Sequence, residues 1–137
     1  MWAVDDAHLP DYLLPRECPR VCWRGNHART GLLDSAAQRV IAIEHGWLSA
    51  LSNAGLQVHA LDPSGFVCLD AGAGYWVGEH EVNVVGVTRV DDCVTALAER
   101  DAELRAVDSL WPYVDAVVAA GLEFSAIRMR NAVPRPP

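Results

Sequence analysis

The sequence predicts an α+β fold, a single domain in which a mixed, mostly antiparallel sheet packs against two or three helices. Short β-branched apolar segments such as Val40–Ile43 have the composition of buried strands. Several such segments follow one another through short turns, and helices alternate with strands in only part of the chain. The length of 137 residues suits one domain, which we expect at residues 1–132, with a disordered tail at 133–137.

The first half of the chain is expected to be mainly β-structure. The run Asp62-Pro63-Ser64-Gly65 has turn chemistry and separates two apolar segments. Gly55 is placed to end a short helix. The polar, glycine-bearing segment 25–35 is expected to be a mobile loop. We expect strands at 19–23, 40–43, 56–61 and 66–69, a helical turn at 9–14 and a helix at 46–53.

The second half is expected to carry two more helices. Asp91 or Asp92 can cap the first of them, and Pro112 fits the first turn of the second, which Gly121 ends. The long valine-rich strand before them either has both faces covered or contains a bulge at Gly86. We expect strands at 81–90, 104–107 and 122–130, and helices at 92–100 and 109–120.

Charge and composition exclude several classes of function. The net charge of −7 argues against nonspecific nucleic-acid binding but leaves a local pocket for a small anionic ligand possible. All 11 basic residues are arginine, so no lysine Schiff base or phosphate-loop lysine can occur. No apolar run is long enough to span a membrane, and the N-terminus lacks the basic residues of a signal peptide. We therefore expect a cytoplasmic protein that does not associate with membranes.

The cysteines allow one metal-binding hypothesis. Cys18 and Cys22, with His27 nearby, have the residue types of a zinc site. On a strand, however, residues four apart lie ~13 Å from each other, too far to share one tetrahedral ion. No second pair of ligands with zinc spacing is present, so we expect no metal site and reduced thiols.

The stretch Asp70–Glu79, DAGAGYWVGE, poses the main question about function. It lacks the ending of a phosphate loop and the three glycines of a dinucleotide fingerprint, and strand-forming residues follow it. One interpretation is a glycine turn that leads Tyr75 and Trp76 into a sheet. The other is a loop that presents Tyr75 or Trp76 at the mouth of a cleft, where an aromatic ring can stack on a ligand.

Two arginines near the C-terminus give a second candidate. In a strand, Arg128 and Arg130 share one face with Phe124 and Ala126. If that face is buried, both guanidinium groups need partners. They either form structural pairs with a carboxylate, or they form an anion pocket, because arginine binds phosphate and carboxylate in a bidentate manner. The partners considered for such pairs are Glu44, Asp70 and Asp115.

Three segments resemble an uncharacterised bacterial family, a domain of unknown function. They are VDDAHLPDYLLPRECPRV, DAGAGYWV and SLWPYVDAVVAAGLEFSAIRMRNA, and the resemblance extends over nearly the whole chain. The family pattern is in turn similar to the ADP-ribosyltransferase-like fold, in which a first-strand histidine and a later tyrosine hold NAD or a nucleotide phosphate. Tyr75 lies where such a tyrosine is expected. The histidine strand, which reads roughly His-Val-Ser-Glu in the family, would precede Met1, so transferase activity could be lost.

Two hypotheses about function result. The first is a pocket for an anionic ligand, a nucleotide or NAD, built from Tyr75, Trp76, Arg128 and Arg130 with Glu44 or Glu123 as an acid. Whether it would be an enzyme is left open, and NAD is the one cofactor considered. The alternative is a noncatalytic interaction domain or a homodimer, because 5 tryptophans and an unpaired sheet edge favour association.

Overall fold

The computed structural model describes residues 1–27 and 31–137. Its strands are β1 (Trp2–Val4), β2 (Arg20–Trp23), β3 (Arg39–Glu44), β4 (Leu56–Leu61), β5 (Phe66–Asp70), β6 (Tyr75–Gly78), β7 (Val84–Val90), β8 (Ala102–Val107) and β9 (Phe124–Ile127). Its α-helices are α1 (Leu48–Ser52), α2 (Cys93–Ala98) and α3 (Trp111–Ala120). Short 3-10 helices are η1 (Leu9–Tyr12), η2 (Gly25–His27), η3 (His45–Trp47) and η4 (Met129–Asn131). The predicted α+β class is confirmed.

A four-stranded sheet forms the centre of the fold, in the order β8-β3-β2-β9. The β3–β8 pair is parallel, and the β2–β3 and β2–β9 pairs are antiparallel. On one face Val21 and Val40 pack in a cluster with Val117 of α3, and on the other face Ile41 packs in a cluster with Leu97 of α2. Because both faces are covered, β3 is buried along its whole length, which explains its continuous apolar sequence.

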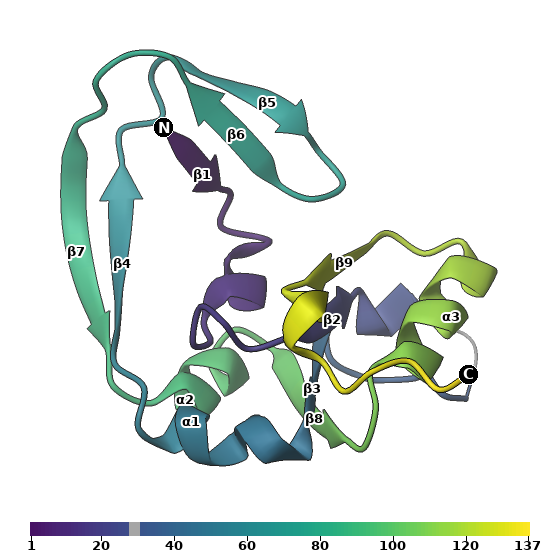
Figure 1. Ribbon diagram of the computed structural model, residues 1–137. Helices are drawn as coiled ribbons and strands as arrows, with labels where there is room; N and C mark the ends of the chain where they lie inside the picture. The colour runs from purple at the N-terminus through teal and green to yellow at the C-terminus, as the bar shows by residue number, and fades with distance from the viewer. Residues whose placement is uncertain (28–30) are drawn as a thin grey trace.

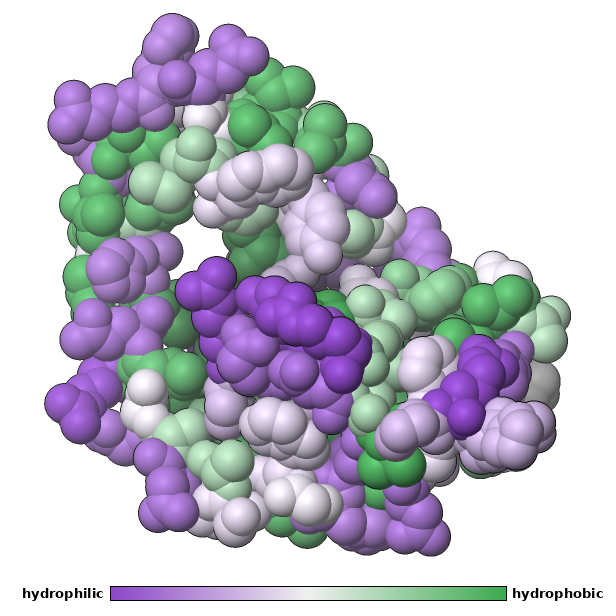
Figure 2. Space-filling model, in the orientation of Figure 1, coloured by the Kyte–Doolittle hydropathy of each residue, from purple (hydrophilic) through white to green (hydrophobic). Residues whose placement is uncertain are grey.

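The other strands form two smaller sheets rather than extending the central one. One has the order β1-β6-β5, and the other is the two-stranded ribbon β4-β7. Figure 1 shows the ribbon at the left and the three-stranded sheet at the top, on either side of an opening. Figure 2, in the same view, shows that side chains leave this opening unfilled. The register of the ribbon shifts between Ala60 and Leu61, next to the pairing of Ala60 with Gly86, which agrees with a bulge there.

Two buried arginines fix the segment between β1 and β2 against the central sheet. The Arg20 guanidinium donates hydrogen bonds to the main-chain oxygens of Cys18, Asp11, Pro15 and Arg16, at 2.9 to 3.3 Å. Arg39 donates two hydrogen bonds to the fully buried Asp11 carboxylate, at 2.8 and 2.6 Å. Burial raises the pKa of Asp11 above its usual value, and Arg39 opposes that effect. The segment that precedes β2 is therefore held by charge-assisted hydrogen bonds as well as by apolar packing.

Several element boundaries differ from the sequence-based expectations. The expected strand at 122–130 ends at Ile127, because Arg128 adopts a left-handed conformation with φ of 54°. The expected helix at 46–53 is divided into η3 and α1. Asp92 caps α2 as predicted, since its carboxylate accepts a hydrogen bond from the Thr95 main-chain N–H. Part of the loop predicted to be mobile, residues 28–30, lies outside the described residues.

The C-terminal residues, which were expected to be disordered, contact the fold. The main-chain N–H of Val133 donates to both oxygens of the buried Glu44 carboxylate, at 3.0 and 3.1 Å. The Arg135 guanidinium pairs with Asp115 at 3.0 Å and lies over the Trp111 ring. Within the described ranges, no helix has the length and apolar character needed to cross a membrane.

Candidate functional site

The glycine stretch forms the turn of the β5–β6 hairpin. The Asp70 carboxylate accepts a hydrogen bond from the main-chain N–H of Ala73 at 3.1 Å, and Gly74 has φ of 68°. A Cβ atom at Gly74 would collide with the ring of His8, so this position needs glycine for space as well as for its backbone conformation. The turn leads directly into Tyr75, the first residue of β6. The stretch is therefore a glycine turn that leads Tyr75 and Trp76 into a sheet, whereas the ligand-binding interpretation of Tyr75 stays a prediction.

Tyr75 is fixed by two aromatic neighbours. Its hydroxyl accepts a hydrogen bond from the Tyr12 hydroxyl at 2.7 Å. Its ring meets the Trp2 ring edge to face, with the centroids 6.4 Å apart and an interplanar angle of 86°. The side chain is therefore held by η1 on one side and by β1 on the other, which limits the positions that its ring can take.

The prediction that Arg128 and Arg130 share a strand face is wrong, because both lie on the turn that follows β9. Arg128 precedes η4 in a left-handed conformation, which is uncommon for a residue other than glycine and costs about 1–2 kcal/mol. Their partner is Glu17, rather than Glu44, Asp70 or Asp115. Arg130 donates to the Glu17 carboxylate at 3.1 Å, and the Nε of Arg128 lies 3.9 Å from it.

Tyr75, Arg128 and Arg130 line one hollow in the surface. It has a volume of about 390 Å³ and is lined by Tyr75, Ala126, Ile127, Arg128, Met129 and Arg130. The structure thus brings together three of the six predicted ligand-binding residues. The Arg130 side chain is 64 % exposed and that of Arg128 28 %, so both guanidinium groups remain accessible from solution.

The carboxylate of Glu17 already pairs with the guanidinium groups of Arg128 and Arg130. The Asn131 amide donates to the Glu17 side chain at 3.1 Å and to its main-chain oxygen at 2.7 Å. The pKa of Glu17 lies below its usual range. The largest cause is the hydrogen bond from the Asn131 amide, and the nearby charges of Arg128 and Arg130 lower the pKa further. The arrangement therefore stabilises a negatively charged oxygen group next to two arginines that line the hollow. Sequence reasoning missed Glu17 and Asn131 because they are 114 residues apart and no local pattern relates them.

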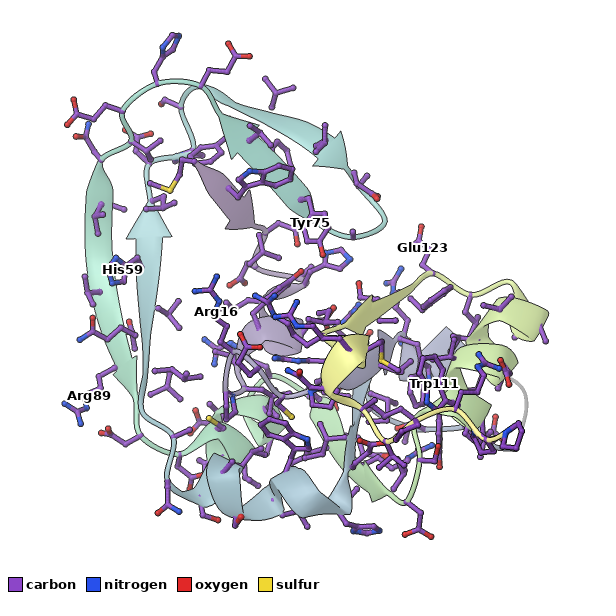
Figure 3. All side chains as sticks on the ribbon, viewed as in Figure 1. Arg16, His59, Tyr75, Arg89, Trp111 and Glu123 are labelled. Atoms are coloured by element: carbon purple, nitrogen blue, oxygen red, sulfur yellow. The ribbon has the colours of Figure 1, made fainter. Side chains whose placement is uncertain are left out.

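The other three candidate residues lie elsewhere. Trp76 does not line the hollow, and its indole Nε1 donates to Asp5 at 3.4 Å. Glu44 is buried against the main chain of Val133. Glu123 lies across a gap from Tyr75 in Figure 3, against the hairpin turn, where a Cβ atom at Gly72 would be 3.5 Å from its Oε1.

The two cysteines of the zinc hypothesis, Cys18 and Cys22, lie in the interior of the fold. Cys18 and Cys22 are both buried, whereas Cys68 is exposed. Burial raises the pKa of Cys18 to about 11 and that of Cys22 well above its usual value, so both side chains are protonated thiols at neutral pH. Among the described residues no group of three or more histidine, cysteine or acidic side chains is placed to hold a metal ion. The His27 side chain lies outside them.

The chain matches a known family model over nearly its whole length. A family model described as "Family of unknown function (DUF6886)" matches residues 1–132. No curated protein matches the chain, and no solved structure matches it either.

Proposed function

The chain belongs to the DUF6886 family of unknown function, and we propose that it binds a small anionic ligand in the hollow between Tyr75 and Arg128–Arg130. One observation carries the proposal. Two arginines that line the hollow together with Tyr75 approach the carboxylate of Glu17, which also accepts a hydrogen bond from the Asn131 amide. Guanidinium and amide groups that donate hydrogen bonds to a carboxylate can donate to a phosphate or carboxylate ligand in the same way.

The conformation of Arg128 supports a role in binding. A left-handed arginine on a surface turn is unfavourable for the backbone, and such residues cluster at ligand-binding sites. The backbone conformation places the Arg128 side chain at the same hollow as Arg130, two residues further along the chain. A ligand with both an anionic group and a ring would use the guanidinium groups and the Tyr75 ring together. A nucleotide or NAD has this combination, in line with the resemblance to ADP-ribosyltransferase-like proteins.

A thermal-unfolding screen tests the proposal directly. The unmodified chain is heated with NAD, ADP-ribose, AMP, ADP and inorganic pyrophosphate, each at low salt. A ligand present at 100 times its dissociation constant stabilises the native state by ~2.7 kcal/mol, which raises the midpoint by several degrees. We expect a shift with at least one of these ligands, and a shift of about half that size in the Arg128→Ala variant if its binding is about tenfold weaker.

The matched control is Arg89→Ala. Arg89 lies at the far end of the ribbon in Figure 3 and pairs with Asp91 at 2.6 Å, so it has the same charge but does not line the hollow. Its removal should leave the shift unchanged. An equal loss of the midpoint shift in both variants would mean that the ligands bind through the net charge of the protein rather than at this site.

A second candidate function, protein interaction or self-association, is favoured by exposed valine and leucine side chains. On β5, Val67 and Leu69 are 70 % and 62 % exposed, and on β7, Val85 and Val87 are 68 % and 58 % exposed. Large apolar side chains gathered at sheet edges are typical of association surfaces. Sedimentation velocity over a wide concentration range tests self-association, because a monomer at every concentration would contradict a homodimer.

A further inference from the structure

A second and larger cavity lies between two strands, β1 and β4, that do not pair with each other. Its volume is about 900 Å³, and it corresponds to the opening visible in Figure 2. Every residue of β1 (Trp2–Val4) and every residue of β4 (Leu56–Leu61) lines it. Figure 1 shows these two strands facing each other across the opening.

The consecutive lining residues show which part of each strand meets the cavity. Successive side chains of a strand point to opposite faces, so a cavity above a face is lined by every second residue. A cavity lined by every residue meets the strand edge, where main-chain N–H and C=O groups project. Within the described residues β1 pairs only with β6 and β4 only with β7, so the cavity separates two strand edges that no neighbour covers.

We propose that this cavity receives an extended polypeptide segment, which pairs with β1 and β4 at once. The inserted strand would join the sheet β1-β6-β5 and the ribbon β4-β7 into one continuous sheet. Neighbouring strands are about 4.8 Å apart, so one inserted strand needs β1 and β4 to be about 10 Å apart. Addition of a strand to an open edge is a general mode of peptide recognition, because main-chain hydrogen bonds supply the affinity. An isolated two-stranded ribbon is marginally stable, so β4-β7 gains most from it.

The walls of the cavity define the chemistry of the occupant. Leu9, Tyr12 and Leu13 line it beside the strand edges, whereas the opening in Figure 2 exposes part of it to solvent. One face of the inserted strand therefore contacts apolar groups and the other contacts water, which requires alternating apolar and polar residues. The exposed Asp6 lies at one end of β1 and favours a basic residue at that end of the segment. The occupant is thus an amphipathic strand of a partner polypeptide, about as long as β4.

A small apolar molecule fits the cavity less well. It would fill the volume and leave the N–H and C=O groups of both strand edges without partners inside an apolar space, which is costly. Tyr75 lines both this cavity and the hollow of the anion site, but Arg128 and Arg130 line only the hollow. The proposal does not rest on the anion site, because the edges of β1 and β4 carry it.

The test joins a donor strand to the complete chain. A segment of alternating valine and threonine with one basic residue is fused ahead of Met1, which itself lines the cavity, through a flexible Gly-Ser linker. The linker gives a local concentration in the millimolar range. The matched control carries proline at alternate positions of the same segment, which removes the N–H groups needed for pairing. Hydrogen exchange and thermal unfolding are measured on both fusions.

We expect a higher unfolding midpoint and at least about tenfold slower exchange of amides in Leu56–Leu61 and Trp2–Val4, with neither effect in the proline control. The same slower exchange on adding the free peptide in trans to the unmodified chain would support the proposal without any effect of the fusion on folding. Unchanged exchange at β4 in both formats would overturn it. Slower exchange at the outer edges, β5 and β7, or equal protection by the proline control would overturn it as well.

Discussion

The hydroxyl of Tyr12 donates a hydrogen bond to the hydroxyl of Tyr75 at 2.7 Å. This contact joins η1, near the N-terminus, to β6, the strand that forms one wall of the anion site. Burial and the Tyr75 hydroxyl raise the pKa of Tyr12, so its hydroxyl stays protonated and remains a donor at neutral pH. The position of Tyr75 at the site therefore depends on a residue 63 positions earlier in the chain.

The coupling between the two tyrosines can be measured with a double-mutant cycle. Tyr12→Phe, Tyr75→Phe and the double variant are unfolded in urea. We expect each single change to lower the free energy of unfolding by about 1 kcal/mol, and the double change to cost less than the sum of the two, because they remove one shared bond. Tyr113→Phe is the control, since Tyr113 stacks on Trp23 and its hydroxyl has no hydrogen bond to another described residue. Strict additivity of the two changes would contradict the shared bond.

Substitution of two glycines with positive φ, Gly65 and Gly74, should lower the free energy of unfolding by different amounts. Gly74 and Gly65 both have positive φ, 68° and 82°. A Cβ at Gly65 meets no atom within 4 Å, whereas one at Gly74 collides with His8. Gly65→Ala should cost about 1 kcal/mol of unfolding free energy for the backbone alone, and Gly74→Ala clearly more. Equal costs in urea denaturation would show that His8 moves away freely.

The buried pair of Asp11 and Arg39 predicts a pH-dependent loss of stability. Arg39→Met keeps the apolar stem but leaves the Asp11 carboxylate buried without its partner, which should cost about 3–5 kcal/mol at pH 7. Burial already raises the folded-state pKa of Asp11 above its unfolded value, and loss of Arg39 raises it further. A raised folded-state pKa favours the protonated group. The cost should therefore shrink as the pH falls towards the unfolded-state pKa, about 4.

Chemical denaturation of both proteins between pH 4 and 8 measures this dependence. Arg89→Met is the control, because its exposed pair with Asp91 should contribute little at any pH. A cost for Arg39→Met that is independent of pH would mean that lost packing, rather than the buried charge, destabilises the variant.

Much of the central fold could be predicted from local sequence. The run Val40–Ile43 is apolar and β-branched because β3 is covered on both faces, and Asp92 and Gly121 act at the ends of α2 and α3 as expected. β1 was missed because three residues carry too little periodicity to indicate a strand. The division into three sheets was also missed, because pairing between distant strands leaves no local signal.

The candidate site was only partly predictable for the same reason. Tyr75 was found because a turn followed by aromatic residues is visible in the sequence, and the two arginines because two charges interrupt an apolar strand pattern. The carboxylate that they share belongs to Glu17, far away in the chain. The left-handed conformation of Arg128 changes which way both arginines point, and nothing in the residues Ile127–Met129 indicates it.

Arg128 also allows binding and stability to be separated. In the Arg128→Gly variant the guanidinium is lost but the left-handed conformation, φ 54°, becomes favourable. We expect this variant to be about 1 kcal/mol more stable than Arg128→Ala, which keeps the unfavourable backbone, while anion binding is weakened to the same extent in both. Urea denaturation of the two variants decides this. An Ala variant that equals the Gly variant would mean that the backbone relaxes once the arginine is absent.

The most direct test of the proposed anion site is the affinity for ADP-ribose and for pyrophosphate, measured by titration calorimetry at low salt on four proteins. The proposal predicts about tenfold weaker binding for Arg128→Ala, unchanged binding for Arg89→Ala, and tighter binding for Glu17→Gln than for the unmodified chain. The Glu17 change is expected to act in the opposite direction because it removes the carboxylate that competes for the same guanidinium groups. Equal affinity in all four proteins, or no binding of either ligand, would contradict the anion site.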